Sequence, residues 1–132
     1  MPPGSEFAEH ALDLLVRVGP PFDTCARLRR MFGGHGIFCD DVMFALIADD
    51  TLYLKVDDAT KPAFLDAGSL PFHYEKSGRT IELSYVTAPD SASEDADELR
   101  EWAHLALAAA NRAQARKPAK KKPAKKRRNT RS

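Results

Sequence analysis

The sequence has little of what a metal site, a membrane span or a disulfide-rich scaffold requires. Only two of its 132 residues are cysteines, Cys25 and Cys39, and their spacing fits neither a zinc ligand pair nor a C-x-x-C motif. No apolar run approaches the ~20 residues of a membrane-spanning helix. The start, MPPGSEFAEH, has neither the basic nor the apolar stretch of a secretory leader. We therefore expect a cytoplasmic protein with reduced thiols and no membrane partner.

Motifs that carry catalysis or bind metals are also missing. The histidines at positions 10, 35, 73 and 104 form no i, i+4 pair and no H-E-x-x-H motif, and no G-x-S-x-G motif occurs. The acid pairs Asp40-Asp41, Asp49-Asp50 and Asp57-Asp58 fall where strands end, and aspartate favours turns there. We expect no enzymatic activity, no cofactor and no metal. An enzymatic alternative depends on His35 alone.

Charge is distributed unevenly along the chain. Lys and Arg total 20 and Asp and Glu total 19, which gives a net charge of +1. The segment 116–132 nevertheless holds ten cations and no acid, so residues 1–115 carry ten cations against all 19 acids, a charge near −9. This asymmetry predicts an acidic domain over 1–115 joined to a basic tail that has a polyanionic partner.

The tail is of low complexity and repeats KPAKK at 117–121 and 122–126. It has no large apolar side chain, so we expect it to be disordered. Its cations suit phosphates, and its lack of aromatic residues predicts DNA binding without sequence preference. The predicted phosphate contacts are Lys117, Lys120, Lys121, Lys122, Lys125, Lys126, Arg127 and Arg128. The alternatives are a tail that only aids solubility, a tail that folds back on the acidic domain, and a tail that binds an acidic membrane.

Residues 1–115 predict an α+β domain with two layers, an antiparallel sheet with helices on one face. Helices are expected over 5–18, 60–67 and 93–115, with a short turn near 22. The predicted strands cover 28–33, 36–39, 42–49, 51–57, 72–77 and 79–87. Two-residue turns at Asp40-Asp41, Asp49-Asp50 and Ser77-Gly78 make the neighbouring strands antiparallel. The predicted N-caps are Ser5, Thr60 and either Ser91 or Ser93.

Two strands alternate clearly between apolar and polar residues. In TLYLKVD, Leu52, Leu54 and Val56 share one face, and in TIELSYV the residues Ile81, Leu83 and Tyr85 do so. This pattern predicts a sheet with one covered face and one solvated face.

The stretch RRMFGGHGIFCDD, residues 29–41, gathers three glycines around His35. A phosphate loop needs a helix after its glycines, but the residues that follow here are typical of strands. We therefore interpret the glycines as a bulge, a bend or a close approach between backbones.

RRMFGGHGIF, FALIADDTLYLKVD and FHYEKSGRTIELSY follow one another in an order that resembles the N-terminal domain of the TfoX/Sxy family. The resemblance covers about residues 5–112. Its most specific residues are Arg30, Met31, Phe32, Gly33, Gly34 and Gly36. It implies a secretion-chaperone-like α+β fold without enzymatic activity or cofactor. Named members are bacterial positive regulators of DNA-uptake genes, and many have a second, helical domain, whereas we expect only the basic tail after residue 115 of this chain.

These observations lead to one main hypothesis and one alternative. The main hypothesis is a non-enzymatic accessory protein, associated with transcription or the nucleoid, whose tail binds DNA and whose body meets a protein partner or a second copy. The alternative is a protein–protein interaction module, with a sheet that docks a partner and a tail that is incidental.

Overall fold

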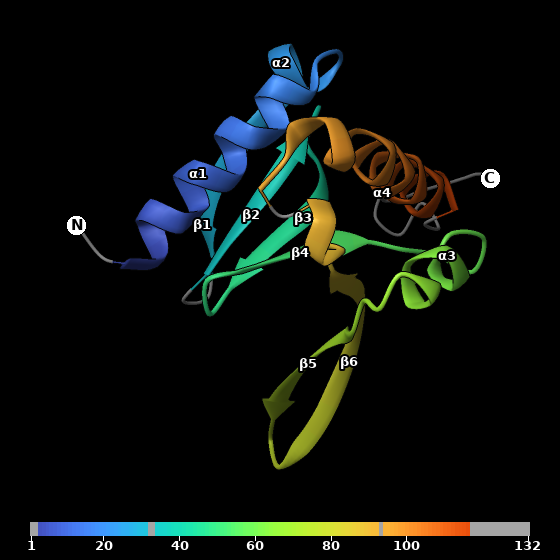
Figure 1. Ribbon diagram of the computed structural model, residues 1–132. Coiled ribbons are helices and arrows are strands. Elements are labelled where there is room, and N and C mark those ends of the chain that lie inside the picture. Colours follow the sequence, from blue (N-terminus) through green and yellow to red (C-terminus); the bar gives the residue numbers. More distant parts are fainter. Residues whose placement is uncertain (1–2, 32–33, 93, 117–132) are drawn as a thin grey trace, which may run out of the picture.

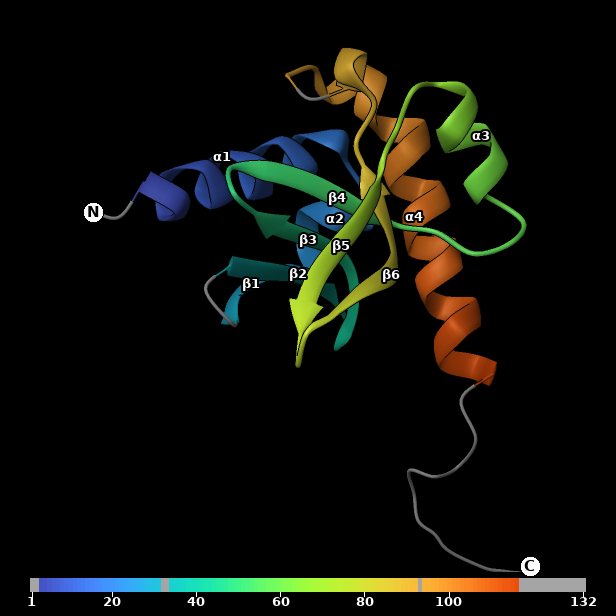
Figure 2. The same ribbon diagram turned by 90° about the horizontal axis from the view of Figure 1, so that it is seen from below.

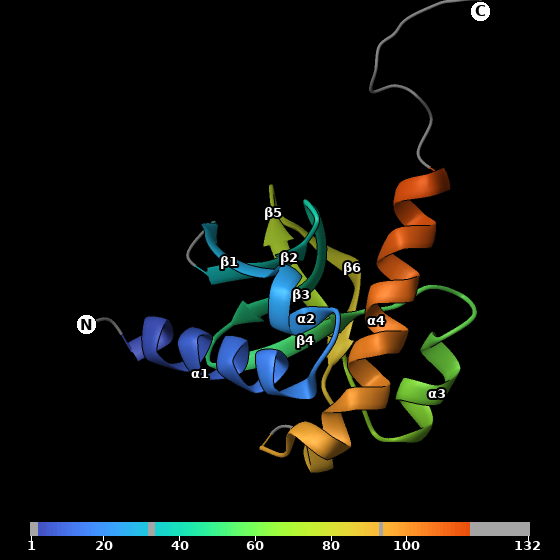
Figure 3. The same ribbon diagram turned by 90° about the horizontal axis from the view of Figure 1, so that it is seen from above.

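The computed structural model describes residues 3–31, 34–92 and 94–116, which fold as a sheet with helices on one face (Figures 1 and 3). The α+β class and the two layers are as predicted. The elements are α1 Pro3–Val18, α2 Phe22–Cys25, β1 Ala26–Met31, β2 Gly34–Cys39, β3 Val42–Ala48, β4 Thr51–Lys55, α3 Lys61–Asp66, β5 Pro71–Lys76, β6 Arg79–Thr87, the 3₁₀ turn η1 Asp90–Ala92 and α4 Ala96–Arg116.

The six-stranded sheet is antiparallel, in the order β1-β2-β3-β4-β6-β5. Its tight turns are those that the sequence predicts. Asp40 and Asp41 have φ angles of 52° and 69°, Asp49 and Asp50 have 51° and 55°, and Ser77-Gly78 has 54° and 78°. Left-handed backbone at both central positions defines the type I′ turn, whose twist matches that of a hairpin. The β5–β6 hairpin projects beyond the rest of the sheet in Figure 1 and lies nearest the viewer in Figure 2.

The core lies between the sheet and the two long helices. Leu14 and Leu15 of α1 are buried in this core, and so are Leu52 and Leu54 of β4 and the following Val56. The buried positions of α4 are Leu99, Ala103, Ala106, Ala109 and Ala110. Because most of these residues are alanine, α4 can pack close to the sheet. Its larger Trp102 instead contacts Phe64 of α3, with ring centroids 4.7 Å apart.

Of the predicted N-caps, Thr60 is confirmed in its position, and the cap of α4 is a different residue. Helix α4 begins after the turn η1, and its cap is Asp95, whose carboxylate accepts bonds from the backbone N–H of Asp97 (2.9 Å) and of Glu98 (3.4 Å). Ser91 lies within η1, so it cannot cap the helix, and Ser93 is outside the described residues. Thr60 is the N-cap residue of α3, as predicted, although its hydroxyl donates to Asp57 Oδ1 (3.2 Å) and makes no capping bond to the helix. The side chain of Ser5 is also outside the description.

The expectation of reduced cysteines is wrong, because the structure joins Cys25 and Cys39 in a disulfide. Strand β1 begins at Ala26, two residues earlier than predicted, and Ala26 pairs with Cys39. Cys25 therefore lies beside Cys39, with 4.8 Å between their Cα atoms, a separation that suits a disulfide. The cysteines thus give no support to a reducing compartment.

The sheet has one covered face and one uncovered face, as predicted, but the apolar side chains of β6 lie on the uncovered face. Val86 pairs with buried Leu54, so Tyr85 and Leu83 lie on the face opposite to the core. There they join the half-buried side chains of Met43 and Leu46. The predicted alternation is present in β6, but its apolar side faces away from the helices.

Candidate functional site

The glycine stretch forms the start of β2, and no helix follows it. Arg30 and Met31 end β1, Gly34 and Gly36 belong to β2, and Phe32 and Gly33 lie outside the described residues. A Cβ atom at Gly34 would collide with the backbone carbonyl oxygen of Ile47 on β3. Gly34 therefore permits a close approach of two strands, and a strand offers no helix dipole for a phosphate.

His35 is half-buried in β2, where its cross-strand partners are Arg30 and Ile47. These partners supply neither a carboxylate to orient the imidazole nor a nucleophile for it to activate. The arrangement lends no support to the catalytic interpretation of His35.

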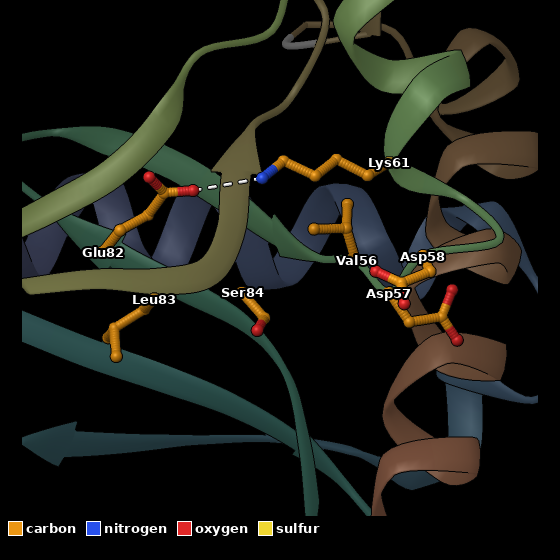
Figure 4. A pocket seen from close by; sticks show the side chains of 7 residues that line it. All are labelled: Val56, Asp57, Asp58, Lys61, Glu82, Leu83 and Ser84. Atoms are coloured by element: carbon orange, nitrogen blue, oxygen red, sulfur yellow. Dashed lines mark hydrogen bonds and ion pairs between the residues drawn. The ribbon is translucent and has the colours of Figure 1, made fainter.

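A hollow of about 160 Å³ opens where β4, α3 and β6 meet (Figure 4). It is lined by Val56, Asp57, Asp58, Lys61, Glu82, Leu83 and Ser84. Most of these residues are polar, and four of them are charged.

Asp57 has the most constrained carboxylate of the hollow. Its Oδ2 accepts a 2.6 Å bond from Arg112 Nε, and its Oδ1 accepts a 3.1 Å bond from Arg112 Nη2. Oδ1 also accepts bonds from the backbone N–H groups of Ala59 (3.1 Å) and Thr60 (3.2 Å). Donation from Arg112 is the main reason that the pKa of Asp57 falls to about 2. The ion pair fixes α4 to the turn that precedes α3.

A second ion pair crosses the mouth of the hollow. Lys61 Nζ donates to Glu82 Oε2 (3.1 Å), and His73 Nε2 lies 3.4 Å from Glu82 Oε1. The bond from Lys61 is the main reason that the pKa of Glu82 is lowered. Because all three side chains are more than a third exposed, this pair contributes little to stability.

Three of these charged groups, Asp57, Lys61 and Glu82, therefore hold elements of the fold together. Sequence reasoning missed the Asp57–Arg112 pair, since 55 positions separate the two residues and the only local signal was an acid pair at a strand end. Within 3–31, 34–92 and 94–116, no three His, Cys, Asp or Glu side chains gather in a way that would hold a metal ion. No helix in those ranges is long and apolar enough to cross a membrane.

The predicted phosphate contacts, Lys117 to Arg128, all lie outside the described residues. Their role stays a prediction from the sequence. Within the described residues, cations also gather on the uncovered face of the sheet.

The fold thus defines a two-layer α+β domain whose sheet is covered by helices on one face. Comparison with known proteins gives the family. The TfoX N-terminal domain matches residues 22–110, which is most of the chain. The chain belongs to the TfoX N-terminal domain family, as the resemblance implied.

A curated relative is similar over a shorter range. Protein Sxy of Escherichia coli (strain K12) is 29% identical to this chain over 63 residues. Those residues are 48% of this chain, and the match takes in only 30% of the relative's length.

Proposed function

We propose that this chain is a non-enzymatic regulatory protein of the TfoX type, associated with transcription or the nucleoid, whose tail binds nucleic acid without sequence preference. Membership of the TfoX N-terminal domain family supports the regulatory role, because the resemblance to TfoX/Sxy implies regulators of DNA-uptake genes. The same resemblance supports the absence of enzymatic activity.

The division of charge carries the nucleic-acid part of the proposal. The segment 116–132 holds ten cations, while residues 1–115 have a charge near −9. A polyphosphate is attracted to the tail and repelled by most of the domain. If about five of the tail cations neutralise phosphates, the log–log dependence of affinity on salt has a slope of about −4.

The test is fluorescence anisotropy with a labelled DNA duplex at several salt concentrations. The full chain is compared with a variant in which the eight cations between Lys117 and Arg128 are changed to glutamine. We expect the variant to lose duplex binding and the steep salt dependence. A tail of the same composition in scrambled order is the matched control, and it should bind like the original. Equal affinity of the glutamine variant and the original would refute the role of the tail.

A protein–protein interaction module is the second candidate, favoured by two exposed leucines, Leu65 in α3 and Leu70 directly before β5. Leu70 is 66% exposed and Leu65 is 43% exposed, which is unusual for large apolar side chains. In this case a defined protein partner remains bound to the glutamine variant and is released by Leu70→Asp. A partner that binds the Leu70→Asp variant as tightly as the original chain would contradict this candidate.

A further inference from the structure

The face of the sheet opposite to the helices has an unusual composition for an acidic domain. Its cations, half of those between residues 1 and 115, are Arg27, Arg29, Lys55, Lys76 and Arg79. Its aromatic residues are Phe38, Tyr53, Phe72, Tyr74 and Tyr85. Within the described strands, no Asp or Glu occupies a position on this face, although residues 1–115 contain 19 acids.

Strand register assigns these residues to the face. Lys55 pairs with Tyr85, next to the buried pair Leu54 and Val86, so the Lys55–Tyr85 pair points away from the core. Side chains alternate along a strand and agree across a pair. Alternation therefore extends the face from Tyr85 along β6 to Leu83, and pairing extends it from Leu83 to Phe72 on β5.

At the other end of the sheet the same rule applies to β1 and β2. Arg29 pairs with Gly36, and a Cβ atom at Gly36 would meet Met43 Sδ at 2.5 Å and Met31 Sδ at 2.8 Å. Arg29, Met31 and Met43 therefore share the uncovered face. Arg30, which neighbours Arg29 in β1, points to the opposite face.

Contacts between side chains make this face continuous. The Arg29 guanidinium lies 4.5 Å from the centre of the Phe38 ring. The hydroxyl of Tyr85 donates to the Met43 carbonyl oxygen (3.2 Å), and burial raises the pKa of Tyr85, which stays a neutral donor. Beyond it the aromatic side chains of the other strands form a row. Their ring centroids are 4.8 Å apart for Tyr53–Phe72 and 6.3 Å apart for Phe72–Tyr74.

The chemistry of this face suits a polyanion with flat apolar groups. Exposed cations attract phosphates, and aromatic rings stack on bases without regard to sequence. Tyr74, at the end of the aromatic row, is 38% exposed, and the Arg29 side chain is 58% exposed. A symmetric second copy is disfavoured, because an isologous contact would press together two faces that each carry five cations and no acid at their strand positions.

Acids do occur at the rim of the face, on the turns between strands. Asp41 forms an ion pair with Arg29 (3.3 Å), and burial, followed by the charge of Asp49, raises the pKa of Tyr53. The Asp41 side chain is 92% exposed, so a phosphate can replace it at Arg29 at little cost.

We propose that the uncovered face of the sheet binds single-stranded nucleic acid, with bases stacked on the aromatic row and phosphates at the surrounding cations. This goes beyond the proposed function, because it needs no tail. A single strand is required, since bases in a duplex are stacked on one another and do not offer their faces to tyrosine.

The experiment uses the full chain carrying the glutamine tail, so that the tail contributes nothing. The probe is a labelled oligothymidylate of about 15 nucleotides, compared with a duplex of equal length. We expect the single strand to bind more tightly than the duplex. Tyr74→Ala should weaken this binding about tenfold, which corresponds to the loss of one stacked base, and Tyr74→Phe should restore it.

Arg29→Ala and Arg30→Ala form a matched pair, because both remove an exposed arginine from β1 but from opposite faces. The first should weaken single-strand binding and reduce its salt dependence, and the second should leave both unchanged. Equal effects of the two variants would overturn the inference. So would a Tyr74→Ala variant that binds normally, or sedimentation that shows dimers which Tyr74→Ala dissociates.

The two proposals fail in different ways. If the glutamine tail abolishes binding to single strands as well as to duplexes, the inference about the sheet is wrong and the role of the tail stands. If the glutamine tail leaves binding to single strands and to duplexes unchanged, while the Tyr74 and Arg29 variants weaken single-strand binding, the role of the tail is wrong and the inference about the sheet stands.

Discussion

Replacing Gly34 by alanine tests whether the glycine stretch serves the packing of strands. The new Cβ atom would collide with the carbonyl oxygen of Ile47, which is part of the β3 backbone and can move only if the strand moves. Overpacking of this kind costs about 1–3 kcal/mol, and contact with backbone places Gly34→Ala near the upper end, at about 3 kcal/mol.

Gly36→Ala is the control, two positions further along the same strand. Its new Cβ atom would meet the sulfur atoms of Met43 and Met31, which lie in flexible, half-buried side chains on the uncovered face. Displacing them costs little. Alanine also reduces the conformational entropy of the unfolded chain, and this stabilises the fold by about 0.4–1 kcal/mol and offsets part of the cost. The net destabilisation of Gly36→Ala should be below about 1 kcal/mol.

Urea unfolding followed by Trp102 fluorescence measures both variants. Trp102 is the single tryptophan, and its contact with Phe64 lies far along the chain from the substitutions. The difference of about 2 kcal/mol should also appear as a melting temperature about 10 °C lower for Gly34→Ala than for Gly36→Ala. Equal stability of the two variants would show that β2 and β3 do not approach closely at Gly34, and the structural explanation of this glycine would fail.

Three further predictions concern single interactions. The pKa of Asp57 is about 2 in the folded chain against about 3.9 when unfolded, so Asp57 stabilises the fold above pH 4, and this stability is lost as pH falls towards 2. Because the Arg112 side chain is 45% exposed, Arg112→Gln should lower the free energy of unfolding at pH 7 only modestly and flatten its pH dependence between pH 4 and pH 2, whereas Arg17→Gln on α1 should change neither. Reduction of Cys25–Cys39, which are 14 positions apart, should lower the free energy of unfolding by about 3 kcal/mol, seen as a lower urea midpoint with dithiothreitol, and an unchanged midpoint would argue against the disulfide. Tyr85→Phe removes the bond to Met43 and should cost about 1 kcal/mol in thermal unfolding, and a variant as stable as the original would show that this bond contributes nothing.

Features that depend on neighbouring residues were predictable from the sequence. The turns at Asp40-Asp41 and Asp49-Asp50 follow from residues that tolerate left-handed backbone between two apolar runs. The end of α3 at Gly68 follows in the same way. Gly68 has φ 94°, and the backbone N–H of Ser69 returns to the carbonyl of Phe64 (3.0 Å).

Features that depend on strand register were not predictable. Whether Leu83 faces the helices or the open side is decided by the pairing of β6 with β4, which brings Val86 to Leu54. The disulfide has the same origin, since a start of β1 two residues earlier places Cys25 beside Cys39. The residues of the charged hollow come from three separate parts of the chain, and no local sequence pattern predicts that they lie close together.

The order of the strands leaves β1 and β5 at the two edges of the sheet. An edge strand offers unpaired backbone groups to any other extended chain, and charged side chains are a common protection against such pairing. Arg27, Arg29 and Arg30 provide this protection on β1, as Glu75 and Lys76 do on β5. These arginines point to two different faces of the sheet but lie on one edge strand. There they keep copies of the protein from pairing edge to edge into fibrils at high concentration.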